Sequence, residues 1–355
     1  MNKGYVIFVA VLSVLWAVMM IVDLAMTVIL LKPTFHNMLQ TPFPLFVIVP
    51  IPILIAYLSG TFTAIWLVLV VIAVIVFLMV GLYRSAKKFE NSPLFRLTEF
   101  FALNYFLSVV YIGLIGLAGH PVITPITTST PFYLNFLTIT NAGLYEELIS
   151  RVAYMGIPLY LYYTWSRHGK QSKSRPSDLP WYRVIWGGGY KFGMPEITVL
   201  IISSVIFGFA HVTSWDLSKV PQAMLGGVLL GILYLRFGLY ADVLFHFSID
   251  SPSLLMPLGY GDPLASSYTN AFISAMVLVS LVGGVVVLVA YVMQAVSAYR
   301  ARGSVPNALP SYNPLPITPV RKAGACKNCG SSHLTLLYDD LYRCDDCGTI
   351  FRKDQ

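Results

Sequence analysis

Charged side chains are scarce in this sequence. Asp, Glu, Lys and Arg make up 11% of its 355 residues, whereas hydrophobic residues make up 57%. An average soluble domain has about 25% charged residues, and the mean hydropathy of this chain is +0.72. Several uncharged runs also reach the roughly 20 residues that a helix needs to cross a bilayer. The composition excludes an ordinary soluble domain and predicts an all-α polytopic membrane bundle.

Cysteine is also rare, and its placement is uneven. The chain has four cysteines, all close to its C-terminal end: Cys326, Cys329, Cys344 and Cys347. This placement excludes a disulfide-stabilised secreted domain, in which cysteines are spread through the fold. Two CxxC pairs instead suit a metal site in a reducing compartment. We therefore expect the C-terminal region in the cytoplasm.

Acidic residues are too few to balance the basic ones, and the formal net charge is +7. Such an excess can mark a nucleic-acid-binding protein, but here Lys and Arg fall mainly in loops beside apolar runs. Basic residues in those places orient membrane spans, with the basic loops in the cytoplasm. We therefore expect a multi-pass protein of the cell membrane that contacts lipid and binds no nucleic acid.

The apolar runs predict about nine membrane crossings. Counting back from a cytoplasmic C-terminus places the basic loops near residues 84–96 and 167–191 inside the cell and the N-terminus outside. Lys3 is the exception to this arrangement. The expected spans are residues 5–31, 44–58, 61–83, 98–118, 132–165, 197–213, 220–236, 238–258 and 268–298.

The sequence divides into four regions. One of them, residues 301–322, is a proline-rich linker, and its composition favours an extended, semi-rigid chain over a packed element. The regions are N-terminal transmembrane helices at 1–97, a core with all the polar motifs at 98–300, the linker at 301–322 and a small β domain at 323–355.

The C-terminal region has the pattern of a metal-stapled domain. Each CxxC pair is followed by a glycine, at Gly330 and Gly348, and a strand-like run lies between the pairs. A unit this small has too little core to fold without a staple, and four thiolates close a tetrahedral site. The region resembles a zinc ribbon, which implies structural zinc, with iron as the chemical alternative. Such a domain could also recruit a protein partner.

One segment places charge inside an apolar helix. Glu146, Glu147 and Arg151 lie within the expected span at 132–165. Ionisable side chains in a bilayer are costly unless they pair or face a polar cavity, so they mark functional sites. On a helix, Glu147 and Arg151 are i,i+4 neighbours, while Glu146 points about 100° away. We therefore expect Glu147 to pair with Arg151 and Glu146 to remain available for chemistry.

Two later spans each offer one histidine. Phe207 and His211 are i,i+4 neighbours on one helix, and so are His246 and Asp250 on another. Asp242, one turn before His246, is expected to cap its helix or orient a partner. The sequence contains no HExxH motif, which excludes a zincin.

The three motifs in this order resemble those of the CPBP, or ABI, family of intramembrane proteases, which includes the type II CAAX prenyl endopeptidases. The family carries EExxxR, FxxxH and HxxxN-or-D motifs on successive helices. Here they read Glu146-Glu147-xxx-Arg151, Phe207-xxx-His211 and His246-xxx-Asp250. The resemblance covers about residues 98–298. It implies an endopeptidase whose substrate is a membrane-associated peptide, in the CAAX enzymes a prenylated one.

By that resemblance, Glu146 would activate a water with the help of His211, and His246 with residue 250 would stabilise the oxyanion. CAAX endopeptidases of this family usually carry Asn at the last position, whose amide can donate a hydrogen bond. Asp250 can donate only when it is protonated, and an ionised Asp250 suits a metal ligand better. A catalytic zinc held by Glu146, His211, His246 and Asp250 therefore stays open beside a metal-free glutamate mechanism.

Two other functions are compatible with these residues. A proton-coupled transporter also places acids and histidines in a helical bundle, although the sequence shows neither repeated halves nor broken helices, which transporters often have. A catalytically silent scaffold could recruit a partner through the ribbon. The intact motifs favour the peptidase, with cleavage expected near the cytoplasmic side of the membrane.

Overall fold

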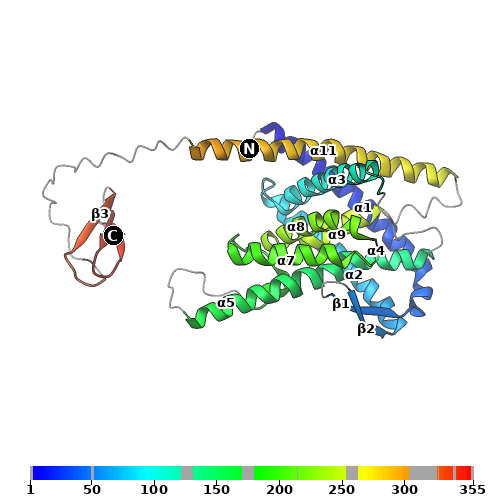
Figure 1. The fold of residues 1–355 in the computed structure, drawn as a ribbon, viewed down its shortest axis with the longest axis horizontal. Helices are drawn as coiled ribbons and strands as arrows, with labels where there is room; N and C mark the ends of the chain where they lie inside the picture. The colour runs from blue at the N-terminus through cyan, green and yellow to red at the C-terminus, as the bar shows by residue number, and fades with distance from the viewer. Residues whose placement is uncertain are drawn as a thin grey trace. The chain divides into compact units, whose positions relative to one another are not determined.

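The computed structural model describes residues 3–48, 52–120, 131–169, 180–213, 215–252, 263–303, 326, 328–338 and 341–352. The chain divides into two compact units, Met1–Gln294 and Ala295–Gln355. The first is a bundle of helices with one β-hairpin, and the second contains a small antiparallel sheet (Figure 1). The predicted fold class, a helical membrane bundle with a small C-terminal β domain, is confirmed. The four domain boundaries stay predictions.

Long apolar helices build the first unit. Two of these helices, α4 and α5, are joined into one continuous run by a nine-residue π-helical segment, η1, which ends at Gly156. This run matches the extent of the single helix predicted for residues 132–165. The helices are α1 (Lys3–Leu39), α2 (Gly60–Lys87), α3 (Pro93–Leu117), α4 (Phe132–Glu147), η1 (Leu148–Gly156), α5 (Ile157–Gly169), α6 (Arg183–Trp186), α7 (Met194–Ala210), the 3-10 turn η2 (Leu217–Lys219), α8 (Val220–Arg236), α9 (Leu239–Asp250) and α11 (Pro263–Gly303).

The predicted span at residues 44–58 is wrong. Strands β1 (Phe43–Ile48) and β2 (Pro52–Leu58) form an antiparallel β-hairpin in that segment. The sequence carries proline at positions 44, 50 and 52, and proline removes the amide N–H that a helix interior needs. The β-branched and aromatic residues between the prolines favour strands instead.

The predicted total of about nine crossings is not confirmed. Within the described residues, five helices are long and apolar enough to cross a membrane: Lys3–Leu39, Gly60–Lys87, Pro93–Leu117, Leu217–Arg236 and Asn270–Arg300. These correspond to five of the predicted spans. Helix α9 has 12 residues, or about 18 Å at 1.5 Å per residue, which is shorter than a hydrocarbon core of roughly 30 Å. The protein is thus a multi-pass membrane protein with shorter helices inside its bundle.

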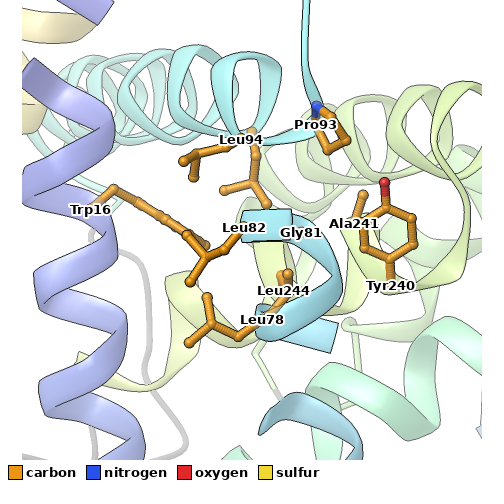
Figure 2. Close-up of a pocket in the computed structure, with 10 residues that line it drawn as sticks. Trp16, Leu78, Gly81, Leu82, Pro93, Leu94, Tyr240, Ala241 and Leu244 are labelled. Atoms are coloured by element: carbon orange, nitrogen blue, oxygen red, sulfur yellow. The ribbon is translucent and has the colours of Figure 1, made fainter. Parts of the chain in front are cut away.

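The amino-terminal half of α9 is anchored by apolar packing. Figure 2 shows a small pocket between four helices, lined by Trp16 of α1, Leu78 of α2, Leu94 of α3 and Leu244 of α9. No acid, base or histidine lines this pocket. The carboxyl-terminal half of α9, which carries the predicted polar motif, lies beyond it.

The second unit has a sheet of three antiparallel strands in the order β3-β4-β5. Gly330 and Gly348, with φ of 75° and 72°, each follow a CxxC pair. Each donates its N–H to the carbonyl of the first cysteine of its pair, Cys326 at 2.7 Å and Cys344 at 2.8 Å. The strands are β3 (Leu334–Tyr338), β4 (Leu341–Cys344) and β5 (Ile350–Arg352).

Candidate active site

A close approach of α4 and α9 brings the predicted acids near the second histidine. A Cβ atom added at Gly143 would lie 3.3 Å from the backbone of Phe247, so a larger residue at Gly143 would push the two helices apart. Glu146 and Glu147 follow Gly143 by one turn at the end of α4, and His246 precedes Phe247 on α9. The segment after Glu147 is π-helical, and such segments are frequent at functional sites.

Glu147 is held from two sides. Its Oε2 accepts a hydrogen bond from Arg151 Nε at 2.8 Å, and its Oε1 lies 2.7 Å from His246 Nδ1. The side chains of Glu147 and Arg151 are both 0% exposed. Removing one partner of a fully buried ion pair costs about 3–5 kcal/mol. The predicted pair is therefore present, and it also orients His246, which the motifs did not predict.

Arg151 connects the π-helical segment to α7. Its Nη1 donates to Ser203 Oγ at 2.8 Å, and the Ser203 hydroxyl donates to the Ser150 carbonyl at 2.7 Å. The guanidinium carbon also lies 5.3 Å from the ring centre of Phe207, a cation–π distance. These contacts position the helix that ends in the FxxxH motif.

Glu146 lies on the more exposed side of the cluster. Its Oε2 is 3.9 Å from His211 Nε2 and 3.9 Å from His246 Nε2. The side chain of Glu146 is 33% exposed, against 19% for His211 and 8% for His246. A separation of 3.9 Å is too long for a direct hydrogen bond and suits two groups that share one water. The structure brings these three predicted residues together.

Hydrogen bonds decide which ring nitrogen of each histidine faces Glu146. His211 Nδ1 is 2.8 Å from the carbonyl oxygen of Phe207, and because a carbonyl only accepts, this nitrogen carries the proton. His246 Nδ1 donates in the same way to Glu147. The Nε2 atoms of both rings therefore point to Glu146, where they can exchange a proton with a bound molecule.

Asp250 completes the cluster through His246. Its Oδ2 lies 3.2 Å from His246 Nε2, and its side chain is 32% exposed. Both ring nitrogens of His246 thus face a carboxylate. A doubly protonated imidazolium satisfies both acids at once, and in that state the ring has no lone pair for a metal.

Three further residues contact or influence the cluster. Lys219 of η2 interacts electrostatically with Asp250 and Glu146. Asp242 is buried, accepts the Val243 N–H at 2.8 Å and interacts electrostatically with Glu147 and Arg151. Asp23 of α1 accepts a hydrogen bond from Ser251 Oγ at 2.8 Å.

Sequence reasoning missed Lys219 and the contact of Asp23. A lysine between two spans reads as an orientation signal, so nothing in the pattern marks Lys219 as part of a site. The partner of Asp23 lies 228 residues away in the chain, and no local spacing can reveal such a contact. The buried charge of Asp23 was the available signal, since an intramembrane acid needs a partner.

The four cysteines of the second unit form a separate metal-binding set. Their Sγ atoms all lie within 4.8 Å of one another, with Cys326 and Cys347 3.7 Å apart and Cys329 and Cys344 3.5 Å apart. Hydrogen bonding between Cys347 and Thr349 lowers the pKa of the Cys347 thiol to about 6, which favours the thiolate form that binds metals. Four sulfur atoms at this spacing fit one tetrahedral metal ion, as predicted.

Comparison with known proteins agrees with the order of the motifs. Residues 128–251 match the family model described as Type II CAAX prenyl endopeptidase Rce1-like. This region contains the residues of all three motifs. No curated protein and no solved structure matches the chain.

Proposed function

Because residues 128–251 match the family model of the Rce1-like type II CAAX prenyl endopeptidases, we propose that this protein hydrolyses a peptide bond of a membrane-associated substrate with a glutamate-activated water. One observation carries the proposal. Glu146 lies 3.9 Å from the Nε2 atoms of two histidines that come from different helices, at a partly exposed site in an otherwise apolar bundle. The neighbouring acid, Glu147, is buried in an ion pair and serves to hold the cluster.

Glu146 is the general base of this mechanism. It takes a proton from a water while the water oxygen attacks the scissile carbonyl carbon, and the carbonyl oxygen becomes negatively charged. When the C–N bond breaks, Glu146 returns the proton to the leaving amine nitrogen. His211 Nε2 faces the same space and orients the water, because His211 Nδ1 is occupied by the Phe207 carbonyl.

The developing oxyanion needs a hydrogen-bond donor or a positive charge. We assign this role to His246 in its protonated state, which Glu147 and Asp250 stabilise from either side of the ring. Asp250 then acts as an orienting acid instead of the amide donor that CAAX endopeptidases usually have. Lys219 adds a second positive charge near the same acids.

The arrangement favours catalysis without a resident metal. Among the described residues, only the ribbon cysteines form a group of three or more His, Cys, Asp or Glu ligands close enough to share an ion. His246 directs both ring nitrogens to carboxylates. A catalytic zinc remains the chemical alternative, because Glu146, His211, His246 and Asp250 are all possible ligands.

The second unit is proposed to be a structural zinc ribbon in the cytoplasm. Four thiolates occupy every position of a tetrahedral zinc, which leaves no site for a substrate. Free thiols that hold a metal also suit a reducing compartment. A ribbon on the end of a membrane enzyme could bind a protein partner, and this role is part of the same proposal.

The proposed reaction is tested by cleavage of membrane-tethered peptides, farnesylated and unmodified, in lipid vesicles that contain the purified protein. Mass spectrometry identifies the products for wild type, Glu146→Gln, His211→Gln and the control Glu90→Gln, an exposed acid far from the motifs in the chain. Removing a general base or its partner lowers rates by about 10²–10⁴-fold. We expect this loss in the first two variants and wild-type rates for Glu90→Gln.

Chelation separates the two mechanisms. The assay is repeated with a chelator in wild type and in Cys326→Ser, whose ribbon site is already disabled. Activity that survives chelation in both proteins supports the glutamate mechanism, whereas activity lost in Cys326→Ser and restored by zinc places a metal at the cluster. Wild-type cleavage by Glu146→Gln would refute the assignment of the base.

A further inference from the structure

Most basic residues of the bundle gather at one end, here called the basic end. Tyr5 of α1 and Tyr291 of α11 both donate hydrogen bonds to Glu99 of α3, at 2.6 and 3.0 Å. Arg84, near the end of α2, lies 4.9 Å from the ring centre of Tyr240, at the start of α9. The Leu94 N–H of α3 donates to Ser85 Oγ of α2 at 3.1 Å and links these two groups of helices. The described basic residues of this end are Lys3, Arg84, Lys87, Lys88, Arg96, Arg183, Lys191 and Arg236.

The opposite end holds the β-hairpin and is called the hairpin end. Tyr145 of α4 accepts a hydrogen bond from the Phe46 N–H of β1 at 3.0 Å. Tyr111 of α3 donates to the Ser218 carbonyl of η2 at 2.6 Å. The described basic residues near this end are Lys32 and Lys219.

The exposure of the polar cluster increases toward the hairpin end. Along α9, Asp242 is 0% exposed, His246 is 8% exposed and Asp250, at the carboxyl end, is 32% exposed. Glu146 is 33% exposed, while Arg151, which lies farther along the same run, is 0% exposed. His211 caps the carboxyl end of α7, which also lies on this side. The cluster therefore opens toward the hairpin end.

Backbone contacts close the bundle on the other side of the cluster. The N–H groups of Gly188, Gly189 and Tyr190 donate to carbonyls at the end of α8, at 2.9, 3.1 and 3.0 Å. A Cβ at Gly188 would meet the Phe237 carbonyl oxygen at 2.9 Å, and Gly188 has a φ of +79°. This segment follows α6 and packs tightly against the link between α8 and α9, which closes the basic end at this point.

The charge distribution orients the two ends in the membrane. Basic residues near span ends favour the cytoplasmic side, and the loop between α5 and α6 adds Lys170, Lys173 and Arg175 in the sequence. Because residues 44–58 form a hairpin and not a span, α1 runs from the basic end to the hairpin end. Lys3 then lies on the cytoplasmic side, which removes the exception in the predicted topology. Lys32 and Lys219 are then the described basic residues on the other side.

We propose that the site opens to the non-cytoplasmic side of the membrane, so that its substrate is a membrane-tethered polypeptide with its scissile bond in the non-cytoplasmic half of the bilayer. This inference rests on the proposed function and replaces the expected cleavage near the cytoplasmic side. A CAAX motif at a cytoplasmic C-terminus would lie on the wrong side.

Cysteine labelling in intact cells tests the orientation independently of activity. Gln40 lies beside the start of α2 at the hairpin end, since a Cβ at Gly60 would meet Gln40 N at 3.0 Å. Lys88 follows the other end of α2. The two labelling variants are Gln40→Cys and Lys88→Cys. Both residues are exposed. A membrane-impermeant maleimide should label Gln40→Cys in intact cells and Lys88→Cys only after permeabilisation. The unmodified chain, with cysteines only in the ribbon, is the control and should also require permeabilisation.

A second measurement tests access to the site. Vesicles sorted by the same labelling into single orientations receive a tethered peptide substrate on the outer surface alone. We expect cleavage at least ten times faster when the Gln40 side faces outward, and loss of that cleavage in Glu146→Gln. Labelling of Lys88→Cys in intact cells, or faster cleavage with the Lys88 side outward, overturns the inference. Equal cleavage by Glu146→Gln would instead refute the proposed function and leave the labelling result standing.

Discussion

His246 donates from Nδ1 to the Glu147 carboxylate at 2.7 Å, which joins the third sequence motif to the first. The other oxygen of Glu147 binds Arg151, and Arg151 binds Ser203 on the helix of the second motif. One buried acid thus links three helices. Its neighbour Glu146 faces the two histidines at longer distances and is partly exposed.

The two adjacent glutamates should respond differently to the same change. Glu147→Gln removes the charge that compensates Arg151, and because both side chains are fully buried, the free energy of unfolding should fall by about 3–5 kcal/mol. Glu146→Gln changes a partly exposed group and should lower it by less than about 1 kcal/mol. Thermal unfolding in detergent measures both, and equal midpoints for the two variants would contradict the division of roles.

Asp23 should act as a positioning residue for α9. Its bond to Ser251 ties α1 to the residue after Asp250, so Asp23→Ala should loosen the carboxyl end of α9 and lower kcat about tenfold with little change in KM. Asp23→Asn keeps an acceptor oxygen and should recover most of the rate. Ser13→Ala is the matched control, because it removes a buried 3.0 Å contact between α1 and α3 away from the motifs. A loss in Ser13→Ala as large as in Asp23→Ala would indicate a general stability effect.

Local patterns predicted most helices but not the hairpin. Hydrophobicity placed β1 and β2 in a span, because valine, isoleucine, leucine and phenylalanine are as apolar in a strand as in a helix. The prolines at positions 44, 50 and 52 decide the outcome, since a helix interior cannot hold three prolines in nine residues without losing hydrogen bonds. Hydropathy also did not predict that α9 ends at Asp250.

The structure brings the predicted site residues close together, but the sequence did not predict how they connect. Spacing placed Glu147 next to Arg151 because i,i+4 neighbours meet on a helix. It could not show that Glu147 also binds His246, because that contact depends on how closely α4 and α9 approach at Gly143. The π-helical turn around Arg151 likewise has no signature in the sequence. Long-range contacts of this kind come from the assembled bundle.

Lys219 should support catalysis through its charge. Because Lys219 interacts electrostatically with Asp250 and Glu146, we expect its charge to stabilise the proposed oxyanion, so Lys219→Gln should lower kcat by roughly three- to tenfold, a loss of about 1 kcal/mol. Lys219→Arg keeps the charge and should retain most of the rate. Lys191→Gln, an exposed lysine at the basic end, is the control for a general change in net charge. Wild-type kcat in Lys219→Gln would remove Lys219 from the site.

The ribbon should hold one metal ion that matters for its own fold and not for the chemistry of the bundle. The four Sγ atoms lie within 4.8 Å of one another, and a domain of this size gains its folding free energy from the metal. Elemental analysis of the purified protein should find about one zinc per chain in wild type and none in Cys326→Ser with Cys344→Ser. Because the cluster around Glu146 shares no ligand with the ribbon, that variant should still cleave peptides at a rate within about twofold of wild type. Zinc that persists in the variant would indicate a second metal site, with Glu146, His211, His246 and Asp250 as its possible ligands. Cleavage lost together with the zinc would show that the ribbon is coupled to catalysis.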